Sequence, residues 1–373
     1  MRDRYGFHPR RLLRMAWVRS AMPQGEAVST RVRPWSWEIL LAVILVVSIV
    51  YNASQSEVYL DADNFVNLFQ LSIEKVVVAL IMTFVIVNGE IDLSVGSVMA
   101  FSAAVMATVN ESGLWGIDVP FGVAILIALS ASLVVGLIHG LVVIKTGIPS
   151  LVVTLAGLIG WRGAARVLVE DRSVGEFPDW FGRLARDELV GPLPFTLVFA
   201  IVAFVVGGIV LHRTAFGRSV FVIGNNAEVA RYSGLDVART KLQLLATSGL
   251  VAGFAGVMFA ARLGSVRANI AETFELDIIT MVLLGGVSIF GGSGSLLGVA
   301  LSIVIVLNLR NGLALANVEG QVQTGVIGAL LIVSVLARNL ADRYLLRPRL
   351  TPSTEPGPPA PERAPPAPRG AAP

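Results

Sequence analysis

The 373-residue chain is 54% hydrophobic and only 15% charged, whereas an ordinary soluble domain is about a quarter charged. Its mean hydropathy of +0.73 largely excludes a soluble globular protein, a disordered protein and a nucleic-acid-binding module. The net charge of +3 comes mostly from arginines near the two ends, and the absence of cysteine excludes disulfides, a thiol nucleophile and a cysteine metal site.

Ten apolar segments predict an all-α integral membrane protein. A helix needs roughly 20 apolar residues to cross the hydrocarbon core, and helices are the default because lipid cannot satisfy free backbone groups. The predicted spans are residues 35–52, 65–88, 93–110, 119–145, 149–169, 193–212, 241–262, 276–290, 295–315 and 321–339. They make up a transmembrane domain of residues 35–340. Residues 1–34 lack the apolar core of a cleaved signal, and the Pro/Ala-rich tail 341–373 is predicted to be disordered.

The charge pattern predicts that both termini are cytoplasmic. Arginines precede the first span and follow the last, and the segment 213–241 carries five further basic residues. With ten spans these three regions fall on one side, which the positive-inside rule places in the cytoplasm. The loops on the other side are acidic, and we assign Glu272, Glu275 and Asp277 to one of them. The short link with Glu90 and Asp92 is an exception, because it should be cytoplasmic and holds no base.

That link belongs to a first interruption of the apolar pattern, residues 88–97. Its candidate functional residues are Glu90, Asp92, Ser94, Gly96 and Ser97. Ionisable groups at membrane depth are costly and tend to face a pathway or a partner. The interruption is therefore either a capped helix start at the interface or a break that lines or stabilises a gate.

A second interruption, residues 285–295, has four glycines within eight residues of an apolar run. Such a run disfavours a continuous helix and indicates either close packing against a neighbour or a broken helix beside a cavity. Paired interruptions in two halves of a chain point to a translocation site. The candidate path residues here are Gly285, Gly286, Ser288, Gly291 and Gly292.

The third element is the basic segment 213–241, called here the coupling segment. Within it we expect a short helix with Asn225 or Asn226 as N-cap, Glu228 in its first turn, and Gly234 as the left-handed residue after its end. The helix is either a surface helix that orders the loop or a handle for a cytoplasmic partner.

The sequence holds no recognisable catalytic constellation. It has no H-E-x-x-H helix, its three histidines are far apart, and no Gly-Lys dipeptide occurs, which excludes a P-loop. We therefore expect a chain that is not an enzyme and binds neither a metal nor a cofactor. If transport uses ATP, another chain must hydrolyse it.

These elements together resemble the permease subunits of bacterial ABC importers for monosaccharides, the ribose, xylose and galactose type. Residues 89 and 91–97 match the family's pattern near G-G-I-D-L-S-V-G-S, with Glu90 in place of the second glycine. Residues 275–277 and 284–294 resemble its E-L-D…L-G-G-T-S-L-x-G-G-x-G pattern, with Ser293 where arginine is common.

Two further segments carry the resemblance over residues 36–340. Residues 148–155, with Thr154, and residues 162–163 are similar to P-x-F-I-x-T-L-G…R-G-L, with Leu151 in place of phenylalanine. Just before this segment, His139-Gly140 replaces an Asn-Gly of the family. The coupling segment resembles the part of the family that meets the ATPase. The residues this implies for that contact are Gly217, Arg218, Gly224, Asn225, Asn226, Ala227, Glu228, Arg231 and Gly234.

The resemblance implies a multi-pass protein of the bacterial plasma (inner) membrane that gives a monosaccharide its path. Its implied partners are cytoplasmic ABC ATPase subunits that use ATP and Mg, an extracytoplasmic sugar-binding protein, a second permease chain and the lipid bilayer, with no nucleic acid. Residues 286–292 and 322–328 lean towards the rhamnose or autoinducer-2 branch.

Three alternatives stay open from the sequence. One is an ABC permease for branched-chain amino acids or nucleosides, which would call for buried charge or aromatic stacking that the spans offer little of. Another is an ion-coupled secondary transporter that uses Glu90 and Asp92 as its ion site. The third is a membrane enzyme, for which we find no catalytic cluster.

Overall fold

The computed structural model describes residues 36–114, 116–186, 188–190 and 193–345. The predicted N-terminal segment 1–34 and almost all of the predicted tail 341–373 lie outside these residues. The helices below belong to one compact unit, residues 35–339, apart from the last turns of the final helix.

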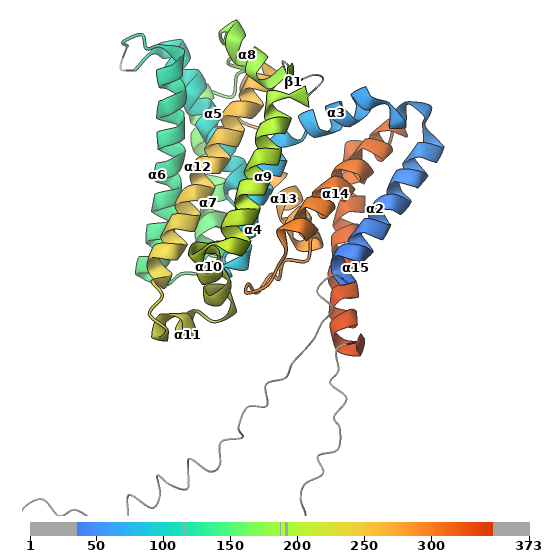
Figure 1. The fold of residues 1–373 in the computed structure, drawn as a ribbon. Coiled ribbons are helices and arrows are strands. Elements are labelled where there is room, and N and C mark those ends of the chain that lie inside the picture. Colours follow the sequence, from blue (N-terminus) through green and yellow to red (C-terminus); the bar gives the residue numbers. More distant parts are fainter. Residues whose placement is uncertain (1–35, 115, 187, 191–192, 346–373) are drawn as a thin grey trace, which may run out of the picture. The chain divides into compact units, whose positions relative to one another are not determined.

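Helices form nearly all of the described chain (Figure 1). They are α2 (Ser36–Gln55), η1 (Glu57–Leu60), α3 (Ala62–Gln70), α4 (Ile73–Val87), α5 (Val95–Ser112), α6 (Phe121–Thr146), α7 (Ser150–Val169), α8 (Asp179–Arg186), α9 (Phe195–Arg213), α10 (Ala215–Asn225), α11 (Ala227–Tyr232), α12 (Val237–Leu263), α13 (Phe274–Leu284), α14 (Leu296–Leu315) and α15 (Gly320–Leu345). Strands β1 (Glu188–Val190) and β2 (Leu193–Pro194) pair in a small antiparallel hairpin.

Five described helices are long and apolar enough to cross a membrane, namely α2, α6, α7, α12 and α14. The count rises to seven if the bent pairs α3–α4 and α9–α10 each form one span. Each of the ten predicted spans overlaps at least one helix, which confirms an all-α, multi-pass protein. The number of ten crossings stays a prediction, because α5 and α13 are not among these candidates and only Gly320–Val333 of α15 counts as a shorter apolar helix.

The predicted span 276–290 is wrong at its end. The helix α13 stops at Leu284, because Gly285 and Gly286 begin a turn in which Gly286 has a φ of +89°. An 11-residue helix is ~16 Å long, about half the hydrocarbon thickness. The second interruption therefore ends a helix, as the glycine run predicted.

The helix α12 packs along α4, α5 and α6 and is buried over much of its length (Figure 1). Small residues permit this, because a Cβ at Gly249 or Gly256 would collide with the backbone of Ser132 or Met99. In a membrane, such close approach replaces the hydrophobic driving force that soluble helices use. α12 thus holds the helices that carry both ends of the first interruption.

Candidate functional site

Four glycines from three predicted elements meet at one point, which we call the glycine junction: Gly89, Gly224, Gly291 and Gly292. A Cβ placed on Gly291 would lie 2.8 Å from the Cα of Gly89 and 2.9 Å from the carbonyl oxygen of Gly224. The backbones of the first interruption, the coupling segment and the second interruption are therefore in direct contact.

A hydrogen bond fixes the junction. The N–H of Gly292 donates to the carbonyl oxygen of Val87, at the end of α4, over 2.8 Å. A Cβ on Gly224 would overlap that same oxygen and lie 2.7 Å from the nitrogen of Gly292. No larger residue fits at Gly224 without moving one of the two interruptions.

Hydrogen bonds from neighbouring residues hold the first interruption in place. The carboxylate of Asp92 accepts hydrogen bonds from the N–H and hydroxyl of Ser94, and from the hydroxyl of Ser248 on α12 at 2.7 Å. Asp92 is 2% exposed. The N-cap residue of α5 is Ser94, which makes no side-chain capping hydrogen bond, so the predicted side-chain cap is not formed. The Asp92 carboxylate secures the loop before the helix and is engaged rather than open to a pathway.

Helix α7 holds the other side of this loop. The hydroxyl of Ser150 accepts from the N–H of Ile91, and that of Thr154 accepts from the N–H of Leu93. The predicted residue Thr154 therefore positions the interruption. Ser97 is also engaged, because its hydroxyl donates to the carbonyl of Ser94 at 2.7 Å.

Glu90 forms an ion pair with Lys241, near the start of α12. The Glu90 side chain is 7% exposed and that of Lys241 is 24% exposed. The pair lies at a cavity of about 220 Å³ that is also lined by Arg231 of α11 and by Gly147 and Pro149 of the α6–α7 turn. The charged residue of the first interruption is thus tied to the coupling segment.

The second interruption is closely packed as well as broken. A Cβ on Gly285 would lie 2.5 Å from the Cα of Val299 on α14, and one on Gly286 would meet the ring of Trp37. The N–H of Ser288 donates to the carbonyl of Ser293 at 2.9 Å, which closes the loop on itself. The predicted close packing and the predicted helix break are both present, while a cavity beside the segment stays a prediction.

The coupling segment contains two helices rather than one. Thr214 caps α10, its hydroxyl accepting from the N–H of Gly217, and α12 begins at Val237, before the predicted start of the span at 241. Gly217 packs under the carbonyls that end α9. Arg218 is exposed. The predicted short helix is α11.

The ends of α11 agree with the prediction. The cap is Asn226, whose side-chain oxygen accepts from the N–H groups of Glu228 and Val229, and not Asn225. Gly234 has a φ of +83°, and the N–H of Leu235 donates to the carbonyl of Ala230. This Schellman arrangement ends the helix after less than two turns, so α11 is a rigid, exposed corner.

Charged groups inside the apolar segments were missed from the sequence. Asp277 pairs with Lys75 of α4 and Arg310 of α14, each over 2.6 Å, and Glu74 pairs with Arg262 of α12. Asp277 and Glu275 are therefore buried in the first turn of α13 and do not lie in an open loop. The available signal was the presence of Glu74, Lys75 and Arg310 inside apolar runs, since such residues need partners in lipid.

Gly96, a predicted path residue, packs against this group. A Cβ on Gly96 would collide with the carboxylate of Glu275 and lie 2.7 Å from the carbonyl oxygen of Ala271. The guanidinium of Arg162, within the predicted span 149–169, donates to the carbonyls of Ala268 and Ile270. These contacts fix the turn before α13 against α5 and α7.

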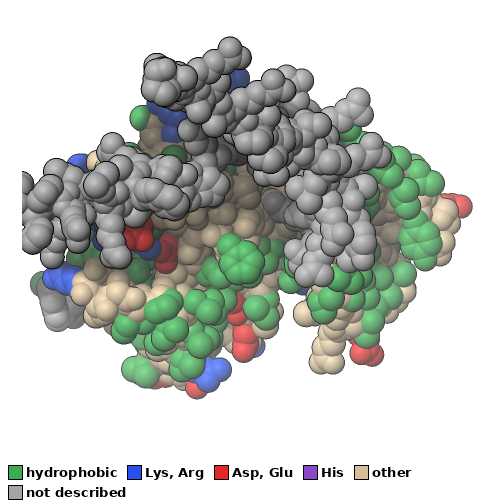
Figure 2. All heavy atoms as spheres, turned by 90° about the horizontal axis from the view of Figure 1, so that it is seen from below, with side chains coloured by type: hydrophobic (Ala, Val, Ile, Leu, Met, Phe, Trp, Pro, Cys, Tyr) green, Lys and Arg blue, Asp and Glu red, His purple; other side chains and the backbone are tan. Residues whose placement is uncertain are grey.

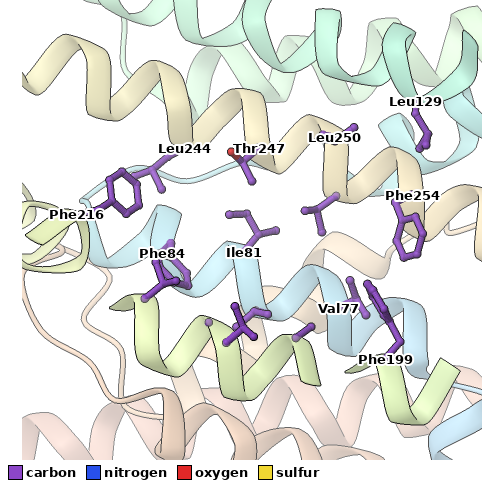
Figure 3. Close-up of a pocket in the computed structure, with 16 residues that line it drawn as sticks. Val77, Ile81, Phe84, Leu129, Phe199, Phe216, Leu244, Thr247, Leu250 and Phe254 are labelled. Carbon is purple, nitrogen blue, oxygen red and sulfur yellow. The ribbon is translucent and has the colours of Figure 1, made fainter. Parts of the chain in front are cut away.

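A cavity between the helices is almost entirely apolar (Figure 3). It measures about 530 Å³ and lies between α4, α9 and α12, with side chains such as Ile81, Phe199 and Leu250 around it. Thr247 is its one residue with a side-chain hydroxyl. A polyhydroxylated solute needs hydrogen-bond partners, so this cavity is unsuited to one. Among the described residues, no cluster of three His, Asp or Glu side chains could hold a metal ion.

The chain is similar to one described protein family and to individual relatives. Residues 64–335 match the family described as "Branched-chain amino acid transport system / permease component". The chain is 37% identical over 324 residues to the "Autoinducer 2 import system permease protein LsrD" of Yersinia enterocolitica, covering 84% of this chain and 95% of that protein. It is 33% identical over 317 residues to the protein of that name from Photorhabdus laumondii, covering 82% and 92%. No solved structure matches.

Proposed function

Because this chain belongs to the permease family of ABC importers and is a multi-pass inner-membrane protein, we propose that it provides the path for a small sugar-like solute in an ATP-driven importer. Autoinducer-2 is the first candidate, since relatives at 33–37% identity carry that name. A monosaccharide such as rhamnose or another pentose or hexose is the second.

The proposal includes partners that this chain does not contain. Cytoplasmic ATPase subunits would bind ATP and Mg, an extracytoplasmic binding protein would deliver the solute, and a second permease chain would complete the path. This chain itself would bind no cofactor and catalyse no reaction. The domain division proposed is residues 1–34, a permease domain 35–340 and the tail 341–373.

The glycine junction is the observation that supports coupling. An ATPase that moves α11 would also move α10, which ends at Gly224 and Asn225. Gly224 lies against Val87 and Gly292 with no side chain between them. A shift of the coupling segment would therefore displace both interruptions, and helix groups would move as rigid bodies to change access.

The ion-coupled alternative loses its proposed site. Glu90 is paired with Lys241, and Asp92 accepts three hydrogen bonds from serine groups. Neither carboxylate is left free to bind and release an ion during a cycle.

The amino-acid alternative was disfavoured because the spans were expected to offer little buried charge. That expectation was wrong, since the spans do hold buried charged residues. Asp277 is paired with Lys75 and Arg310, and Glu74 with Arg262, which leaves these five groups unavailable for a zwitterion.

Reconstitution tests this function. The full chain, with its ATPase and binding protein, should take up labelled autoinducer-2 or rhamnose in proteoliposomes only when ATP is hydrolysed. Glu228→Arg, on the exposed face of α11, and Gly234→Val, at a φ of +83°, should each lower uptake at least severalfold while leaving membrane insertion unchanged. Uptake that persists without hydrolysis, or that an ion gradient drives without the ATPase, would contradict the proposal.

A further inference from the structure

The loop between α13 and α14 carries an aromatic side chain that is almost fully exposed. Phe290 is 88% exposed and its neighbour Ile289 is 48% exposed. The loop is nevertheless ordered, because the N–H of Gly291 donates to the carbonyl of Ser288 at 2.9 Å and the N–H of Ser288 donates to Ser293. The ring is thus held away from the protein by a closed turn.

This turn lies beside the coupling segment. A Cβ on Gly292 would lie 2.7 Å from the Cα of Asn225, the residue before the cap of α11. On α11, Tyr232 is 86% exposed and Val229 is 55% exposed. Figure 2, which views the molecule from below Figure 1, shows hydrophobic side chains at the surface with charged side chains nearby.

Such a surface has the composition of a protein interface. Interfaces are enriched in aromatic anchors that insert into pockets, surrounded by a polar rim. Here Phe290 and Tyr232 would be the anchors, with Glu228 and Arg231 as exposed charges between apolar contacts.

We propose that the turn 288–294 is a second docking surface for the ATPase subunit, with Phe290 inserting into an apolar pocket of that subunit beside the contact made by α11. This rests on the proposed function, and it assigns the second interruption to partner binding rather than to the lining of the path.

The charges on α11 favour the ATPase over lipid as the occupant. Glu228 and Arg231 are exposed and lie on a helix of six residues, and exposed charges of both signs are costly in hydrocarbon. Because the turn contacts the residue that precedes this helix, a water-soluble subunit that covers α11 also reaches Phe290.

Photocrosslinking tests the contact in the full importer. Phe290, Tyr232 and Val167 are each replaced with p-benzoylphenylalanine in the complete chain, expressed with its ATPase and irradiated in membranes. Adducts are identified by mass spectrometry. We expect an adduct with the ATPase at positions 290 and 232. We expect none at Val167, a 77% exposed residue near the C-terminal end of α7.

The outcomes separate the two proposals. An ATPase adduct at 232 together with only lipid or a second permease chain at 290 overturns the docking surface and leaves the proposed function standing. If neither position captures the ATPase, both proposals fail.

Affinity supplies a second measurement. Phe290→Ala should weaken binding of the purified ATPase to the permease in nanodiscs about tenfold or more, as truncation of an interface anchor does. Val167→Ala is the matched control and should leave it unchanged. Because Phe290 is exposed, both variants should elute as the wild type does in size-exclusion chromatography. Unchanged ATPase affinity in Phe290→Ala would overturn the inference.

Discussion

At the scale of single residues, Gly224 is a tightly constrained position of the coupling segment. It lies in α10 at a φ that any residue adopts, so the contact with Val87 and Gly292 alone excludes a side chain. The sequence marked Gly224 as a contact residue by resemblance, but the reason for a glycine there is visible only in the packing.

Gly224→Ala should reduce uptake at least tenfold, because the added methyl group forces the junction apart at a cost of about 1–3 kcal/mol. Gly160→Ala is the matched control, since a Cβ at Gly160 meets no described atom within 4 Å. Uptake in proteoliposomes and thermal unfolding in detergent provide the measurements. Wild-type uptake in Gly224→Ala would show that the junction tolerates displacement.

The ion pair of Glu90 and Lys241 should respond unequally to loss of either partner. Lys241→Met leaves a carboxylate whose side chain is 7% exposed, whereas Glu90→Gln leaves an ammonium whose side chain is 24% exposed. We expect Lys241→Met to cost of the order of 3 kcal/mol and Glu90→Gln less, because a buried unpaired charge carries the larger penalty. Denaturation in detergent measures both, and the reverse order would refute the argument.

At the scale of elements, α11 depends on its ends. It has six residues, too few to be stable as an isolated helix in water. Its cap at Asn226, its Schellman end at Gly234 and the packing of Ala230 between Ile223 and Val237 hold it together.

Asn226→Ala should remove two capping hydrogen bonds, of 2.9 and 3.0 Å, at a cost of about 1 kcal/mol. Amide hydrogen exchange at Glu228 and Val229 should accelerate about fivefold, and uptake should fall. Asn225→Ala, one residue earlier, is the control for the cap and should leave the exchange at Glu228 and Val229 unchanged. Equal effects of the two substitutions would place the cap elsewhere.

Local sequence patterns predicted the helices and their breaks well, but not the tertiary contacts between them. Apolar runs located every long helix, and glycine and asparagine positions located the breaks and the ends of α11. The junction could not be predicted, because Gly89, Gly224 and Gly291 are far apart in the chain and no local preference brings them together. For the same reason Asp277 was read as a loop residue, since its partner Lys75 is 202 positions away.

At the scale of the whole unit, buried ion pairs connect helices that are remote in sequence. Asp277 of α13 joins Lys75 of α4 to Arg310 of α14, and Lys75 also lies 4.1 Å from the ring centroid of Phe274. Such pairs are costly to form in low dielectric and costly to break.

Asp277→Asn should therefore destabilise the unit by about 3–5 kcal/mol, because it leaves two cations without their partner. Arg172→Ala removes an exposed pair with Glu111, whose side chains are 48% and 38% exposed, and should lower the melting temperature far less, because solvent screens exposed pairs. Thermal unfolding in detergent compares the two. Similar melting temperatures would mean that the buried pairs contribute no more than surface ones.

The glycine junction also bears on how the solute specificity of such a permease can change. Its contacts are made by main-chain atoms, which are common to every amino acid, so they carry no chemical information about the transported molecule. If the junction transmits the motion of the coupling segment as proposed, substitutions along the passage can alter which solute is accepted while that transmission stays intact. Selectivity and energy conversion would then be separable, because different atoms perform them.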